Sequence, residues 1–92
     1  ASLEIKKAYY EPKSLVLKVE IENNSSCDFI LQNNTPFSLI ESSDIIEIKG
    51  KSSIILQFRT KEKLDLFDWS FTALNAVNTP NNHPVIKKQI KL

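Results

Sequence analysis

The sequence has 92 residues, enough for one small domain, and its 12 basic and 11 acidic side chains leave a formal net charge of +1. This near balance, with no run of like charge longer than two, argues against nucleic acid or an anionic membrane surface as a partner, because both attract a basic patch. No apolar stretch approaches the roughly 18–20 residues that cross a bilayer, which argues against membrane insertion.

Alternation of apolar and polar residues with a period of two dominates the chain, and no segment carries a sustained helical stripe. Strands are expected over residues 3–10, 15–22, 27–32, 37–39, 45–48, 54–59, 66–74 and 85–92. The clearest is 15–22, where Leu15, Leu17, Val19 and Ile21 alternate with charged residues. Such a strand has one buried face and one solvated face, as in an antiparallel sheet.

Turn-forming residues separate these segments. Pro12 supplies no backbone N–H, so a strand ladder stops there, and the Asn-rich stretches after residues 22 and 32 favour turns. Gly50, the only glycine, stands between two expected strands, where a positive φ is often required. Cys27, the only cysteine, is expected to be a small, half-buried strand residue on one face with Phe29 and Leu31.

Seven or eight short strands with turn signals every 8–12 residues predict an all-β fold. The expected architecture is an immunoglobulin-like or fibronectin-III-like antiparallel β-sandwich of about seven strands. We expect a single domain over residues 1–92. Ala1 and Ser2 look like a processing edge, so this domain is expected to be a fragment of a longer protein.

Catalysis within the chain is not expected. His83 is the only histidine, and a lone histidine in a polar turn is typical of a surface residue, without partners for a metal site. Glu20 and Glu22 share a solvated strand face that would neither raise a pKa nor exclude water. Asp65 and Asp68 lack the spaced acidic loop of a calcium site. We therefore expect no catalytic, metal or cofactor-binding residues.

Binding of a glycan is the alternative that the aromatic residues leave open. Tyr9 and Tyr10 point to opposite faces of their strand, so one of them is expected to be at least partly exposed and able to stack on a sugar. Trp69 is expected in the core, because it shares a strand face with Phe67 and Phe71. The Asn-x-Ser/Thr patterns that start at Asn23, Asn24 and Asn33 are expected by chance in an Asn-rich chain.

The last part of the sequence, LDLFDWSFTALNAVNTPNNHPVIKKQIKL, carries a family resemblance. It has an apolar strand that ends at Leu74-Asn75, a Thr79-Pro80 turn and a final alternating strand from Val85 to Leu92. This ending resembles that of the small Ig-like domain appended to PHP-type phosphodiesterases of Bacteroidetes. The first strand and the segments VEIENNSS and IEIKGKSSIILQF fit the same resemblance more loosely.

The resemblance implies an accessory role. In that family a metal-dependent catalytic domain precedes the Ig-like domain and holds a His/Asp cluster, and no part of that cluster maps onto this sequence. The implied partner is the neighbouring catalytic domain of the same polypeptide, which this domain would stabilise or position. The implied location is extracytoplasmic, either periplasmic or on the cell surface. A carbohydrate- or surface-binding module is the alternative.

Overall fold

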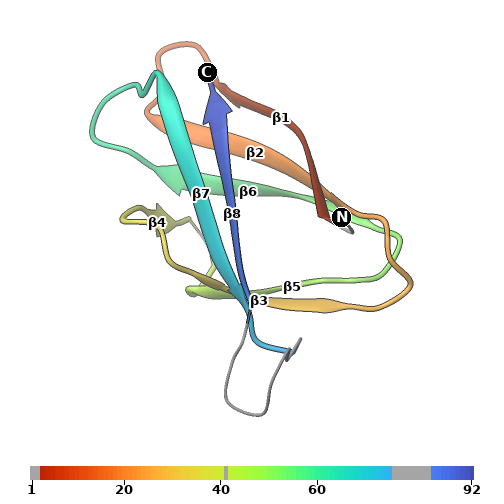
Figure 1. Cartoon of the computed structure of the whole chain (residues 1–92). Coiled ribbons are helices and arrows are strands. Elements are labelled where there is room, and N and C mark those ends of the chain that lie inside the picture. Colours follow the sequence, from red (N-terminus) through yellow and green to blue (C-terminus); the bar gives the residue numbers. More distant parts are fainter. Residues whose placement is uncertain (1–2, 41, 76–83) are drawn as a thin grey trace.

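The computed structural model describes residues 3–40, 42–75 and 84–92, and the described residues form eight strands (Figure 1). The strands are β1 (Leu3–Tyr10), β2 (Val16–Asn23), β3 (Phe29–Asn33), β4 (Ser38–Leu39), β5 (Ile45–Ile48), β6 (Ser53–Arg59), β7 (Leu66–Ala73) and β8 (Val85–Lys91). Among these residues there is no helix long and apolar enough to cross a membrane. His83 and the Thr79-Pro80 turn lie outside the described residues.

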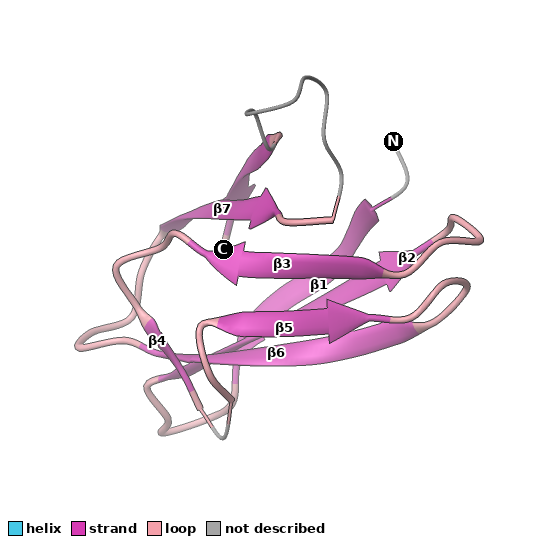
Figure 2. Cartoon of the chain, turned by 90° about the horizontal axis from the view of Figure 1, so that it is seen from below, coloured by secondary structure: helices cyan, strands magenta, loops and turns pink. Residues whose placement is uncertain are grey.

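The strands form two four-stranded sheets that face each other (Figures 1 and 2). The first has the order β1-β2-β6-β4 and the second the order β5-β3-β7-β8, and every pairing is antiparallel. Two pairs of consecutive strands, β1–β2 and β7–β8, are neighbours in the same sheet. Every connection from β2 to β7 crosses to the other sheet. The predicted all-β sandwich is confirmed, with the two-residue strand β4 as the eighth strand.

The core lies between the inner faces of the two sheets. Leu17, Val19 and Ile21 of β2 are fully buried, which confirms the face predicted from their alternation. They pack toward the inner face of β7, whose side chains Phe67, Trp69, Phe71 and Ala73 are also buried. Burial of each large apolar side chain contributes about 1.5–3 kcal/mol, so these two strands supply much of the stability of the fold.

Two residues assigned to buried strand faces are exposed. Leu15 is 45% exposed because β2 begins one residue later, and its carbonyl oxygen accepts from the Thr60 N–H (3.0 Å) instead of joining the ladder. Cys27 is exposed because β3 begins only at Phe29, so the prediction of a half-buried strand residue was wrong.

The positive φ expected at Gly50 lies on the next residue. Lys51 has a φ of 58°, and no described glycine has a positive φ. Gly50 is needed for a different reason, since a Cβ atom there would lie 2.6 Å from the carbonyl oxygen of Ser26. Close approach of two backbone segments, and not turn handedness, excludes a side chain at this position.

Candidate functional site

The two tyrosines have different surroundings. The Tyr10 ring packs against the core, and its hydroxyl lies 2.8 Å from the Thr60 hydroxyl and accepts from the Leu64 N–H (3.2 Å). Tyr10 therefore ties the end of β1 to the β6–β7 connection and has little of its polar surface left for a ligand. Tyr9 lies on the outer face of the same strand, half-buried, with the Lys7 ammonium 5.4 Å from its ring centroid.

Trp69 lies in the core, as its spacing predicted. It is 1% exposed and stacks on Phe71 with a centroid distance of 4.5 Å. Its indole N–H has no hydrogen-bond partner among the described residues. A buried N–H without a partner costs stability, so the packing of the ring outweighs that penalty here. Trp69 offers no surface on which a sugar could stack.

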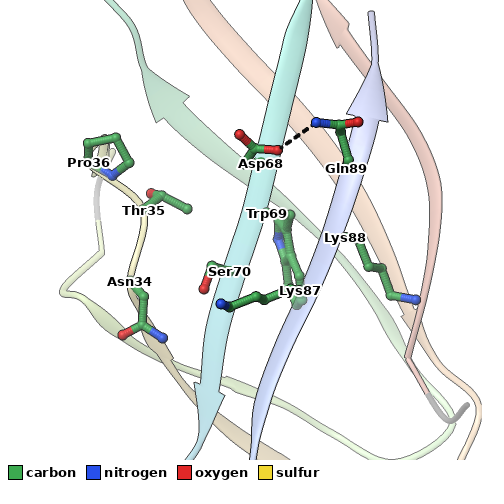
Figure 3. A pocket seen from close by; sticks show the side chains of 9 residues that line it. All are labelled: Asn34, Thr35, Pro36, Asp68, Trp69, Ser70, Lys87, Lys88 and Gln89. Carbon is green, nitrogen blue, oxygen red and sulfur yellow. Dashed lines mark hydrogen bonds between the residues drawn. The ribbon is translucent and has the colours of Figure 1, made fainter.

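A trough of about 480 Å³ lies between the β3–β4 connection and strands β7 and β8 (Figure 3). Its lining residues are Asn34, Thr35, Pro36, Asp68, Trp69, Ser70, Lys87, Lys88 and Gln89. The Gln89 side-chain amide donates to the Asp68 carboxylate (3.1 Å), and in this view the Trp69 ring lies between the ribbons of β7 and β8. The trough thus has hydrogen-bonding groups on an open strand surface but no exposed aromatic platform.

Two connections between strands share one hydrogen-bond pattern, and we call residues 23–27 the first asparagine turn and residues 33–37 the second asparagine turn. In the first, the Asn23 Oδ1 accepts from the N–H and the hydroxyl of Ser25 (2.9 and 2.8 Å), and the Asn23 Nδ2 donates to the Cys27 carbonyl (2.8 Å). In the second, Asn33, Thr35 and Phe37 make the corresponding bonds (2.9, 2.6 and 2.9 Å).

These turns account for two of the three Asn-x-Ser/Thr patterns. Asn23 is fully buried and Asn33 is half-buried, and the side-chain amide of each is bound within its own turn. Of the three asparagines that begin these patterns, only Asn24 is exposed. From the sequence alone, these patterns are expected as turns and chance occurrences. The signal for the shared bonding is the repeat of Asn-Asn-Ser/Thr directly at the end of two expected strands.

The Leu-Asn pair of the family resemblance has a structural role. The Leu74 N–H donates to the Ile30 carbonyl (2.8 Å) just beyond the end of β7. The Asn75 side chain then continues this pairing, because its Oδ1 accepts from the Ile30 N–H (3.0 Å) and its Nδ2 donates to the Asp28 carbonyl (2.6 Å). The pair therefore fixes the start of β3 against the end of β7.

Three lysines at the surface form ion pairs, and each of them has a raised pKa. The carboxylates of Glu22 and Glu4 raise the pKa of Lys6, at distances of 3.5 and 3.4 Å. A hydrogen bond to Glu11 raises the pKa of Lys18. A hydrogen bond to Glu47 (3.2 Å) and the nearby charge of Asp28 raise the pKa of Lys49. Lys6 and Lys49 are exposed and Lys18 is half-buried at the surface, so solvent screens these pairs and they contribute little to stability.

No group of three or more His, Cys, Asp or Glu side chains within residues 3–40, 42–75 and 84–92 could hold a metal ion. Glu20 and Glu22 lie on the outer face of β2, where Glu22 pairs with Lys6. Asp65 and Asp68 are both exposed, and Asp68 is bound to Gln89. These four carboxylates therefore lie at the surface in two separate places, one on each sheet.

Two facing antiparallel sheets with crossing connections define a β-sandwich of the immunoglobulin type. The chain belongs to the family described as Ig-like domain, which matches residues 3–89. This match confirms the Ig-like resemblance that the sequence carries. Among curated proteins, no relative matches the sequence.

A solved structure shares the fold. It is a two-domain protein from Bacteroides vulgatus that contains a predicted PHP-like metal-dependent phosphoesterase. The TM-score is 0.68 at 16% sequence identity, and the match covers 99% of this chain and 25% of that chain. At this identity the likeness establishes the fold alone, and this chain spans about a quarter of the length of that protein.

Proposed function

We propose that this chain is a non-catalytic accessory domain of an exported bacterial protein, in which it follows a PHP-type phosphoesterase domain and stabilises or positions it. The observation that supports the proposal is the solved neighbour, in which an Ig-like fold equivalent to the whole of this chain occupies 25% of a protein that contains such a phosphoesterase. The role of one protein is not fixed by the fold of another, so the link requires a direct test.

In this proposal, the preceding domain joins the sandwich on its N-terminal side, near Leu3. Leu3 is buried opposite Asn23, beside the first asparagine turn and the turn between β5 and β6. These two turns are cross-linked, because the Asp28 carboxylate accepts from the Gly50 N–H (2.8 Å) and the Lys51 N–H donates to the Ser25 carbonyl (2.9 Å). We call this part of the sandwich the Leu3 end. A preceding domain would meet these two hydrogen-bonded turns there.

The test compares the 92-residue chain with the longer polypeptide encoded by the same reading frame. We expect no hydrolysis of bis(4-nitrophenyl) phosphate by the 92-residue chain with Mn²⁺ present, and hydrolysis by the longer polypeptide. Removal of residues 3–92 from the longer polypeptide should lower its melting temperature or its activity. Turnover by the 92-residue chain, or a reading frame without a metal-dependent hydrolase region, would contradict the proposal.

Glycan or surface binding is a second candidate, and the position of Tyr9 is the observation that favours it. Tyr9 is half-buried on the outer face of β1, while the Tyr10 hydroxyl is engaged by Thr60 and Leu64. If this candidate is correct, retention of the chain in a polysaccharide affinity gel should be lost in Tyr9→Ala. Tyr9→Phe serves as the control, because it keeps the ring.

A further inference from the structure

The end of the sandwich opposite Leu3 exposes several leucines. This end, which we call the Leu66 end, contains the β1–β2 turn, the β6–β7 connection and the C-terminal residue Leu92, whose N–H donates to the Asp65 carbonyl (Figure 1). Three of the six exposed large hydrophobic residues that the structure describes lie here, namely Leu15, Leu66 and Leu92, whereas the other three lie apart on strands β5, β6 and β8. Apolar side chains that gather at one end of a small domain indicate an interaction surface.

A groove of about 600 Å³ lies at this end between residues 36–38 and 59–64. Phe37 and Leu64 are half-buried in it and pack against the core, where the Phe37 ring lies 5.9 Å from the Phe67 ring. The Tyr10 hydroxyl accepts from the Leu64 N–H and also contacts Thr60. The floor of the groove is therefore held by the core and by hydrogen bonds before any ligand arrives.

The rim of the groove is basic. Arg59 and Lys61 line it, Lys63 is the next basic residue along the chain, and Glu62 is the one acidic residue of the lining. Among the described residues, no carboxylate lies within 4.0 Å of the Arg59 guanidinium or of either lysine ammonium, whereas Lys6, Lys18 and Lys49 are all paired. Arg59 is also the only arginine beside eleven lysines.

We propose that this groove binds an extended acidic peptide segment of a partner protein, with one apolar side chain against Phe37 and Leu64 and a carboxylate on Arg59. A guanidinium presents a planar pair of N–H donors that matches a carboxylate, and beside an apolar surface this pairing is stronger than in open water. An apolar centre with a charged rim is the usual anatomy of a protein interface. A domain attached at its Leu3 end would present this groove away from its attachment point.

The test uses the isotopically labelled chain and the acetylated, amidated peptide Asp-Leu-Asp-Leu-Asp-Leu at low salt. We expect chemical-shift changes at residues 37–38 and 59–64. Arg59→Gln should weaken binding about tenfold, the effect of losing one charge-assisted hydrogen-bonded pair. Lys87→Gln removes an exposed charge from the outer face of β8 and should leave the affinity unchanged. The matched peptide Asn-Leu-Asn-Leu-Asn-Leu should bind at least tenfold more weakly.

Four outcomes would overturn the proposal. These are no shift changes with the acidic peptide, equal affinity for the uncharged peptide, an equal loss of affinity in Lys87→Gln and Arg59→Gln, or a dimer of the chain whose interface contains Phe37 and Leu64. None of them bears on the link to a phosphoesterase domain, which is tested by the activity of the longer polypeptide. The peptide titration and the activity assay therefore test the two proposals independently.

Discussion

The first and the second asparagine turns use the same hydrogen-bond pattern in different surroundings. Asn23 is completely buried, and its Nδ2 also lies within hydrogen-bond distance of the carbonyl oxygens of Ile48 (3.1 Å), at the end of β5 in the opposite sheet, and of Lys49 (3.2 Å), the next residue. Asn33 is only half-buried, and its additional partner is the exposed carboxylate of Asp44 (3.4 Å). Five residues of local sequence thus set the turn, while the surroundings decide how much the turn stabilises the fold.

The difference has a physical reason. A polar group that loses its partner in the interior leaves the other group unsatisfied, and water cannot replace the lost bond. At a half-exposed position water can enter and restore much of the bonding. Substitution of each asparagine separately should therefore distinguish two contributions to the free energy of unfolding. Both turns make the local contribution, whereas only Asn23 adds bonds to the opposite sheet.

The largest effect is expected for Asn23→Ala. This change leaves the Ile48 carbonyl without a side-chain donor and removes three bonds within the first asparagine turn. We expect a loss of about 3 kcal/mol in the free energy of unfolding, measured by urea denaturation. Asn24→Ala is the matched control at the adjacent exposed residue and should change the free energy by less than about 0.5 kcal/mol. Equal effects of the two changes would show that the buried bonds are not decisive.

Gly50→Ala should be the next most damaging change. Its Cβ atom would lie 2.6 Å from the Ser26 carbonyl oxygen and would push the β5–β6 turn away from the first asparagine turn. We expect a loss of about 2 kcal/mol, because the nearest atoms belong to backbone and cannot rotate away. Ser53→Ala, at an exposed position of the adjacent strand, provides the control. Wild-type stability in Gly50→Ala would mean that the two turns are not in close contact.

Asn33→Ala should cost about 1 kcal/mol, less than half the effect at Asn23. The bonds to Thr35 and Phe37 are lost, but water can reach the groups that remain. The same urea titration measures the change, and Asn34→Ala is the neighbouring control. A cost as large as that of Asn23→Ala would contradict the assignment of the extra stability to burial.

The smallest effect concerns Lys49 beside the first asparagine turn. Its pKa is raised above the ordinary value of 10.5 by Glu47 and Asp28, so the folded state binds the proton more tightly than the unfolded state does. The resulting stabilisation is fully present below pH 10.5 and is lost as the pH rises through the raised pKa. We expect the small stability difference between wild type and Lys49→Gln to shrink as the pH rises above 10.5. A stability difference that grows as the pH rises would mean that folding lowers the pKa of Lys49.

The strand pattern was predictable because it depends on local spacing. The buried faces of β2 and β7 follow from strict alternation, and both agree with the structure. The exposure of Leu15 and Cys27 was not predictable in this way, because it depends on where each strand begins to pair with its neighbour. The groove at the Leu66 end was also missed, because Phe37, Arg59 and Leu64 come from separate segments.

The sequence by itself determined the all-β fold, the sandwich class and the buried faces of β2 and β7, because alternation with a period of two places one set of side chains on each sheet face. Only the tertiary structure decided that Asn23 is a buried cross-link, that Gly50 is required by a neighbouring backbone, and that Tyr10 is bound to another strand connection. Each of these roles depends on an atom far away in the chain, and local spacing carries no information about which segments meet across the two sheets.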